Sequence, residues 1–75
     1  MAGPLLSMRF GEAVRKHRIA TGYSQEKIAE LAQLHPTYIS MVERGVRNPT
    51  LDVAARLSEA LGIRLSKLIE DTEAQ

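Results

Sequence analysis

Residues 24–45 read SQEKIAELAQLHPTYISMVERG, and their pattern is the most informative about the fold. Ser24 is typical of a helix N-cap, because its hydroxyl can accept a hydrogen bond from a backbone N–H two or three residues later. The apolar positions that follow have helical spacing and predict a helix that ends near Ala32. Pro36 suits the first turn of a second helix, which Gly45 ends. The stretch therefore predicts two short helices joined by a connection of a few residues.

Three further helices are predicted around this stretch. The first covers about residues 8–21, and one of its faces is predicted to comprise Phe10, Val14, His17 and Thr21. The fourth follows a predicted cap at Thr50, and its inward stripe comprises Leu51, Ala54, Leu57, Ala60 and Leu61. The fifth covers about residues 65–70. No stretch alternates between apolar and polar residues as a strand would, so the predicted fold class is all-α, with five helices.

The length of 75 residues fits a single domain. We predict that the domain covers residues 8–70, between an N-terminal lead of residues 1–7 and an acidic tail of residues 71–75. The lead either packs on the core through Leu5 and Leu6 or is disordered. Neither a signal peptide nor an apolar run of the ~20 residues that span a membrane is visible, so we expect a cytoplasmic protein with no membrane partner.

Charge is unevenly distributed, although the chain as a whole is nearly neutral. Ten Lys and Arg residues oppose nine Asp and Glu residues, which gives a net charge of +1. Glu70, Asp71 and Glu73 all lie near the end of the chain, which leaves ten basic and six acidic residues, a net charge of +4, in residues 1–69. This distribution is compatible with one basic face and one acidic end, or with an ordinary solvated surface.

Residues that could catalyse a reaction or hold a metal are scarce. Cysteine is absent, and the two histidines, His17 and His35, do not have the spacing of metal ligands on a helix. No glycine-rich phosphate loop and no Ser/His/Asp constellation can be named. We therefore expect no metal, no cofactor, no small-molecule ligand and no enzymatic activity. His17 is interpreted as a partly buried residue on a helix face, and His35 as the cap before Pro36.

The helix predicted over about residues 36–44 has two different sides. Ile39 and Val42 are predicted to point inward. The outer side carries Thr37, Ser40, Met41 and Arg44. Surface helices usually carry Glu, Lys and Gln. Short hydrogen-bonding residues like these can instead approach the edges of bases in the major groove of DNA, and a basic residue near the helix end can bind a phosphate. The pattern favours a helix-turn-helix DNA-binding unit over a plain surface helix.

The sequence resembles the phage-repressor helix-turn-helix family, also called Cro/CI-type or XRE. The motifs that carry the resemblance are Gly22-Tyr23-Ser24-Gln25-Glu26, Ile28-Ala29, Tyr38-Ile39-Ser40, Glu43-Arg44-Gly45, Arg47-Asn48-Pro49-Thr50-Leu51 and Ala60-Leu61-Gly62-Ile63. They occur in the right order and extend over about residues 9–70. The resemblance implies a compact, repressor-like domain in which the second and third helices form the helix-turn-helix and the third, the recognition helix, reads the major groove.

The resemblance also implies roles for individual residues. The positions that face bases are occupied by Pro36, Thr37, Ser40 and Met41. The positions that meet the DNA backbone are occupied by Gln25, Tyr38, Arg44, Arg47 and Asn48. The resemblance also implies that Gln25 braces the recognition helix. Pro36 and Met41 offer only apolar contacts, so DNA shape and the two arginines are expected to supply part of the specificity. Gln33 is a departure from the family pattern, because it stands where a turn glycine is usual.

Arg18 and Glu43 match a pair of positions that the family joins by an ion pair. An arginine late in the first helix and a glutamate near the end of the recognition helix can form two parallel hydrogen bonds. Such a pair would hold the recognition helix against the rest of the domain. We therefore predict that Arg18 and Glu43 form a structural ion pair.

Dimerisation is expected, because one recognition helix reads only a few base pairs and a dimer reads a palindrome. The predicted dimer interface comprises Ile63, Leu65, Leu68 and Ile69. The alternative is that all four residues close the core of the monomer.

The predicted function is sequence-specific binding of double-stranded DNA by a small, stand-alone dimeric repressor or controller. With no room for an effector domain, it would act by occupying DNA, either blocking RNA polymerase or contacting it from an adjacent site. The alternative is an antitoxin-like or adaptor protein-interaction module that keeps the fold and binds little DNA. Exposed apolar residues such as Leu31 favour the alternative, and a steep salt dependence of DNA binding would favour the first.

Overall fold

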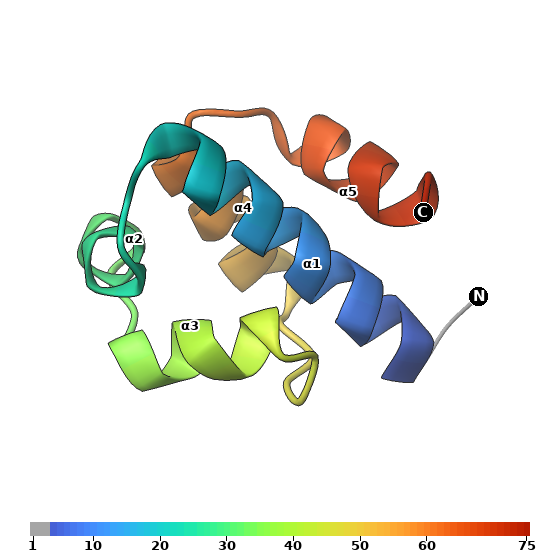
Figure 1. Cartoon of the computed structure of the whole chain (residues 1–75), viewed down its shortest axis with the longest axis horizontal. Coiled ribbons are helices and arrows are strands. Elements are labelled where there is room, and N and C mark those ends of the chain that lie inside the picture. The colour runs from blue at the N-terminus through green and yellow to red at the C-terminus, as the bar shows by residue number, and fades with distance from the viewer. Residues whose placement is uncertain (1–3) are drawn as a thin grey trace.

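The structure, a computed structural model, describes residues 4–75. Its five helices are α1 (Pro4–Thr21), α2 (Gln25–Ala32), α3 (Pro36–Glu43), α4 (Leu51–Leu61) and α5 (Leu65–Glu73). The described residues contain no strand, which confirms the predicted all-α class. α1 runs through the middle of the molecule, where α3, α4 and α5 pack against it, and α2 packs against α3 and α4 (Figure 1). None of these helices combines the length and the apolar character needed to cross a membrane.

The predicted start and stop signals lie at the observed helix ends. The hydroxyls of Ser24 and Thr50 each accept a hydrogen bond from the backbone N–H three residues later. The Nδ1 atom of His35 accepts from the backbone N–H of Thr37 at 3.1 Å, so His35 is the cap of α3. Left-handed glycines follow three of the helices at Gly22, Gly45 and Gly62. Local chemistry therefore sets these boundaries.

The first helix is longer than the sequence predicts, because it begins at Pro4 rather than near residue 8. Residues 4–7, predicted as a lead before the domain, are the first turn of α1, and residues 1–3 lie outside the described part of the chain. Ser7 is buried, and its hydroxyl donates a hydrogen bond to the side-chain oxygen of Asn48 in the loop before α4. This contact ties the first turns of α1 to a loop forty-one positions later in sequence.

The last helix is also longer than predicted and continues to Glu73, so most of the expected acidic tail is helical. Thr72 is buried, and its hydroxyl donates to the backbone oxygen of Leu68 one turn earlier in α5. The Gln75 side chain donates to the backbone oxygen of Arg9 at 2.7 Å. The Nε2 atom of His17 lies 2.6 Å from a carboxylate oxygen of Asp71. The contacts of Gln75 and Asp71 attach the C-terminal end of the chain to α1.

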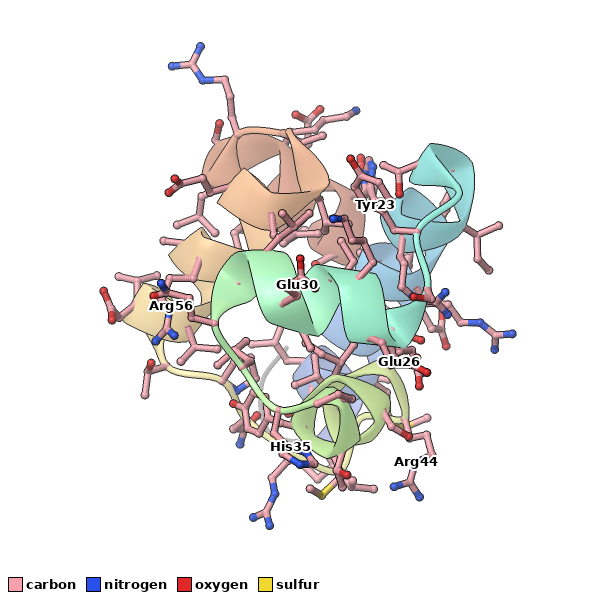
Figure 2. The ribbon with its side chains drawn as sticks, turned by 90° about the vertical axis from the view of Figure 1, so that its left-hand side faces the viewer. Tyr23, Glu26, Glu30, His35, Arg44 and Arg56 are labelled. Carbon is pink, nitrogen blue, oxygen red and sulfur yellow. The ribbon has the colours of Figure 1, made fainter. Side chains whose placement is uncertain are left out.

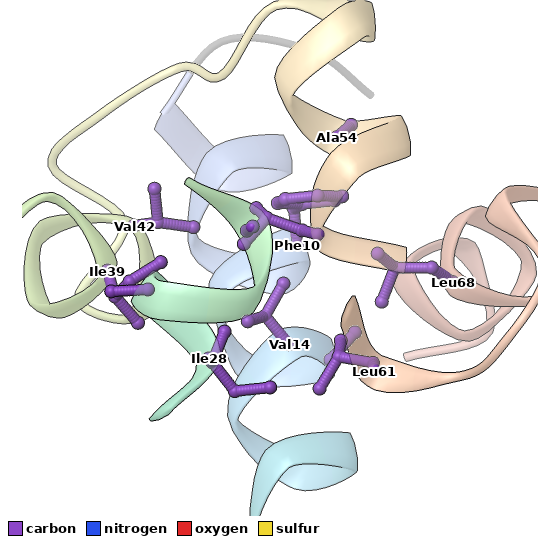
Figure 3. Packing of buried hydrophobic residues seen from close by; sticks show 12 residues of the cluster. Phe10, Val14, Ile28, Ile39, Val42, Ala54, Leu61 and Leu68 are labelled. Atoms are coloured by element: carbon purple, nitrogen blue, oxygen red, sulfur yellow. The ribbon is translucent and has the colours of Figure 1, made fainter. Parts of the chain in front are cut away.

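A single core lies between the five helices, and each helix contributes to it (Figure 3). The buried apolar residues are Phe10, Ala13, Val14, Ile28, Ala29, Ala32, Ile39, Val42, Ala54, Leu57, Leu61 and Leu68. Two residues predicted to point inward do not: Leu51 is 74% exposed at the start of α4, and Thr21 is exposed at the end of α1. Both occupy terminal turns, where the helix face has already passed the edge of the core.

Candidate nucleic-acid interface

The helix α3 presents one side to the core and the other to solvent. Ile39 and Val42 are completely buried or nearly so, as predicted. The four predicted base-facing residues follow one another at helical spacings of one, three and one, which places them on the opposite side. All four retain accessible surface, fully for Thr37 and partly for Pro36, Ser40 and Met41. The outer side is therefore short, mostly uncharged and open to solvent.

Two arginines flank the C-terminal end of α3 without engaging an acid. Arg44 and Arg47 are exposed, and neither forms an ion pair within residues 4–75. Figure 2 shows Arg44 directed away from the body of the molecule. Free cationic side chains beside a helix of this character can bind phosphate groups, which carry most of the affinity in protein–DNA complexes. The structure thus gathers positive charge at one edge of α3.

The other predicted backbone-contacting residues are partly engaged within the protein. Gln25, the first residue of α2, donates from Nε2 to a carboxylate oxygen of Glu43 at 3.1 Å. Tyr38 packs its ring against the core and is only partly exposed. Asn48 is exposed but accepts the hydrogen bond from Ser7. Their polar groups remain near the surface, although Gln25 and Asn48 already have an intramolecular partner.

The predicted ion pair between Arg18 and Glu43 is present. Nε of Arg18 donates to one carboxylate oxygen of Glu43 at 2.6 Å, and Nη2 donates to the other at 3.1 Å. The side chain of Glu43 is only 4% exposed and that of Arg18 only 15%. The hydrogen bond to Glu43 is the main reason that the pKa of Arg18 lies above its ordinary value. With Gln25, three donors converge on one buried carboxylate and lock the end of α3 to α1 and α2.

A close approach between backbones fixes α3 against α1. A Cβ atom at Gly11 would lie 2.1 Å from the backbone oxygen of Val42 and 2.8 Å from that of Glu43. Only glycine allows the two helices to approach this closely. Gly45 is similar, since a Cβ there would lie within 2.8 Å of Met8. The sequence predicts Gly45 as a helix end, but no local pattern marks Gly11 as a contact point between helices.

The turn between α2 and α3 contains the departure from the family pattern that the sequence predicts. Gln33 has φ 58° and ψ 47°, in the left-handed region that favours glycine. Arg56 of α4 reaches this turn (Figure 2), and sequence reasoning did not select it. Its guanidinium donates to the backbone oxygens of Ala32 and Gln33. No sequence motif marks such a contact, because it joins residues 23 and 24 positions apart.

The predicted dimer residues differ in exposure. Leu68 is completely buried within the chain, so its assignment to a dimer interface is wrong: it fills the core and has no surface to offer a partner. Ile63, Leu65 and Ile69 are partly buried against the core and keep some exposed surface. A groove of about 320 Å³ lies between α1, α4 and α5. It is lined by Leu6, Ser7, Phe10, Asn48, Pro49, Leu51, Ala54, Ile69, Thr72 and Glu73.

No set of three or more potential ligand residues that could hold a metal occurs within residues 4–75. The two histidines have structural partners instead, His17 in Asp71 and His35 in the backbone of α3. The chemistry that remains on the surface is hydrogen bonding from the outer side of α3 and the positive charge beside it.

Known proteins share this arrangement. A family model described as helix-turn-helix matches residues 14–68, which include α2, α3 and α4 and parts of α1 and α5. The chain belongs to the helix-turn-helix family. The five-helix domain, the tight α2–α3 turn and the outward side of α3 are therefore the features of a helix-turn-helix protein.

Several relatives of this helix-turn-helix protein are restriction-modification control proteins. Control protein C.BamHI from Bacillus amyloliquefaciens is 43% identical over 68 residues, which cover 89% of this chain and 84% of that protein. The crystal structure of the controller protein C.AhdI from Aeromonas hydrophila matches with a TM-score of 0.81 and 40% identity, over 83% of this chain and 94% of that chain. A tetramer of the controller protein C.Esp1396I, in complex with its natural 35 base-pair operator, matches with a TM-score of 0.79 and 28% identity, over 91% of this chain and 95% of that chain.

Proposed function

We propose that this helix-turn-helix protein is a transcriptional controller that binds a palindromic operator as a dimer. The observation that carries the proposal is the outer side of α3, where Thr37 and Ser40 are accessible while Glu43 anchors the helix from behind. Arg44 and Arg47 supply the phosphate contacts beside it. The likeness to control proteins such as C.BamHI supports a role in regulating a restriction-modification system.

A net charge of only +1 fits a specific regulator. Non-specific affinity for DNA grows with the number of phosphates that a protein neutralises. A nearly neutral chain with Arg44 and Arg47 beside α3 would bind random DNA weakly and still hold the backbone at its operator. The regulator would act by blocking RNA polymerase or by contacting it. We place it in the cytoplasm, where the DNA lies, and assign it no enzymatic activity.

For the dimer, we propose that the groove between α1, α4 and α5 takes a second copy of this chain. Leu51 and Leu6 are both exposed at its rim, and Ile69 lines it from α5. Leu65 and Ile69 continue the apolar surface along α5, next to Glu70 and Glu73. The proposed face keeps Leu65 and Ile69 of the predicted interface, and Leu6 and Leu51 take the place of Leu68. Ile63 is not among the residues that line it.

Selection of bound duplexes from random DNA tests the proposal. We expect an inverted repeat whose half-sites are centred about one helical turn apart, roughly 34 Å. Ser40→Ala should relax the preference at one position in each half-site, whereas Ser66→Ala, a matched change on α5, should leave the selected sequence unchanged. Recovery of no common sequence would refute sequence-specific binding.

Salt dependence separates DNA binding from the interaction-module alternative. Affinity for the selected duplex should fall with salt at a log–log slope of about −0.9 per phosphate contact. Arg44→Gln should reduce that slope by about 1, and Arg64→Gln, at the opposite end of the molecule, should not. Binding that is weak and insensitive to salt would favour a module that recognises protein.

A further inference from the structure

The turn that joins α2 to the recognition helix α3 has an unfavourable backbone conformation. Gln33 is the single non-glycine residue with positive φ among residues 4–75. In that region the Cβ atom of an L-residue lies too close to the following carbonyl oxygen. Gln33 is also exposed, so no burial of its own side chain stabilises the turn. Something outside the turn must hold it.

The hydrogen bonds inside the turn account for only part of this stabilisation. The backbone N–H groups of Gln33 and Leu34 reach back to the carbonyls of Ala29 and Glu30. These bonds leave the carbonyls of Ala32 and Gln33 at the end of α2, where the helix dipole concentrates negative charge. The last turn of α2 has no basic residue of its own to meet them.

Arg56 supplies the missing cation from α4. Its Nε atom donates to the backbone oxygen of Ala32 at 3.1 Å, and Nη2 donates to that of Gln33 at 2.7 Å. Figure 2 shows the Arg56 side chain beside the end of α2. The guanidinium is a rigid planar fork, so both contacts depend on the relative orientation of the two carbonyls.

The two carbonyls that Arg56 holds lie on either side of the strained residue. The Ala32 carbonyl belongs to the peptide plane before the Cα atom of Gln33, and rotation about φ moves that plane. The Gln33 carbonyl belongs to the plane after it, and rotation about ψ moves that one. A rigid fork bound to both oxygens therefore restrains both dihedral angles of Gln33 at once.

We propose that Arg56 is a positioning residue for DNA reading: from α4 it holds Gln33 in the left-handed conformation and so sets the direction in which α3 leaves α2. The consequence for DNA rests on the proposed function. A residue of α4 would then control operator affinity without touching a base. A lysine would restrain the turn less, because its ammonium can reach both carbonyls but does not hold its donors in a rigid fork.

The test combines substitution of the clamp with relief of the strain. Arg56→Gln should weaken binding to the inverted-repeat duplex that the wild-type protein selects by roughly tenfold, within the range of coupling between contacting residues. Arg56→Lys should bind the duplex only slightly better than Arg56→Gln does. Adding Gln33→Gly should restore most of the affinity, because glycine adopts the left-handed conformation unaided. Gln33→Gly alone should have little effect, and Arg64→Gln controls for the loss of one positive charge.

The same variants distinguish a clamp from a direct phosphate contact. If Arg56 bound phosphate, Gln33→Gly would not rescue Arg56→Gln, and the salt slope would fall by about one phosphate contact. That result would overturn the inference. All measurements belong well below the melting temperature of each variant, so that loss of folded protein does not imitate loss of affinity.

Amide hydrogen exchange tests the clamp without DNA. The Leu34 amide, which bonds the Ala29 carbonyl at 2.8 Å, should exchange faster in Arg56→Gln and recover when Gln33→Gly is added. Unchanged exchange in Arg56→Gln would refute the inference. If exchange follows this pattern but the wild-type protein binds no duplex, the clamp is supported and the proposed function fails instead.

Discussion

At the scale of single residues, Glu43 concentrates the contacts that orient α3. It is nearly buried and receives three hydrogen bonds from Arg18 and Gln25. A buried carboxylate depends on such partners, because the cost of removing it from water is recovered only through them. The pair was predictable from sequence through the family resemblance. The same resemblance predicts that Gln25 braces the recognition helix, but not that it does so by donating to this carboxylate.

Substitution of Glu43 tests how much the ion pair with Arg18 contributes to stability. Glu43→Ala leaves the partly buried guanidinium of Arg18 without its carboxylate and should destabilise the protein by roughly 3–5 kcal/mol. Glu30→Ala removes only an exposed pair with Lys27, in which Glu30 is 74% exposed, and should cost less than about 0.5 kcal/mol. Urea denaturation followed by circular dichroism measures both. Equal unfolding midpoints for the two variants would contradict this ranking.

At the scale of helices, the register between α1 and α3 depends on Gly11. Helical periodicity and cap signals predicted which helices form, because both are local properties of the chain. They did not predict how near two helices lie, since the same glycine would be tolerated on an open surface. The extra turn of α1 escaped prediction for a similar reason, because it is held by Ser7 and Asn48 across the fold.

Gly11→Ala should therefore force α1 and α3 apart. The added methyl group would overlap backbone atoms of α3 rather than a movable side chain, and the expected loss of stability is about 1–3 kcal/mol or more. DNA affinity should fall by more than the loss of folded protein would produce, because α3 itself is displaced. Gly22→Ala is the matched control, because its Cβ meets no atom within 4 Å and only its positive φ is disfavoured. Thermal melting and DNA titration should both rank Gly11→Ala as the more harmful change.

The contact between α1 and α5 gives the protein a specific acid sensitivity. Two hydrogen bonds lower the pKa of Asp71 below its ordinary value, and the one from His17 has a larger effect than the one from Lys67. A carboxylate whose folded-state pKa is lowered stabilises the fold above its unfolded pKa of about 3.9. That stabilisation is lost as the pH falls through the folded-state pKa.

Asp71→Asn should therefore be less stable than wild type near pH 6, and the difference should shrink below about pH 4 as the wild-type carboxylate is protonated. Urea midpoints across this range measure the effect. Ser66→Ala, an exposed change on α5 that removes no titratable group, should follow the wild-type pH profile. A constant gap between Asp71→Asn and wild type at all pH values would argue against the role of this carboxylate.

At the scale of the whole molecule, the recognition surface and the proposed dimer face are different parts of the structure. α3 carries the first, and the groove between α1, α4 and α5 carries the second. Sequence alone could not separate core from interface in α5. Leu65, Leu68 and Ile69 share a similar pattern, yet only Leu68 is fully enclosed.

Leu51→Gln should weaken self-association while leaving the stability of the monomer nearly unchanged, because the Leu51 side chain is already mostly in solvent. Sedimentation equilibrium over a range of protein concentrations measures the shift toward monomer. Ile19→Gln removes a comparably exposed apolar residue from the other end of α1 and should leave association unaltered. If both variants associate like wild type, the groove is not the dimer face.

The contact at Gly11 also has a thermodynamic consequence for ligand binding. With its backbone seated against α1 and its end fixed by Glu43, α3 meets DNA as a preorganised surface rather than one that folds on contact. Calorimetry should then give a heat-capacity change that corresponds to the interface area alone, without the larger negative contribution of coupled folding.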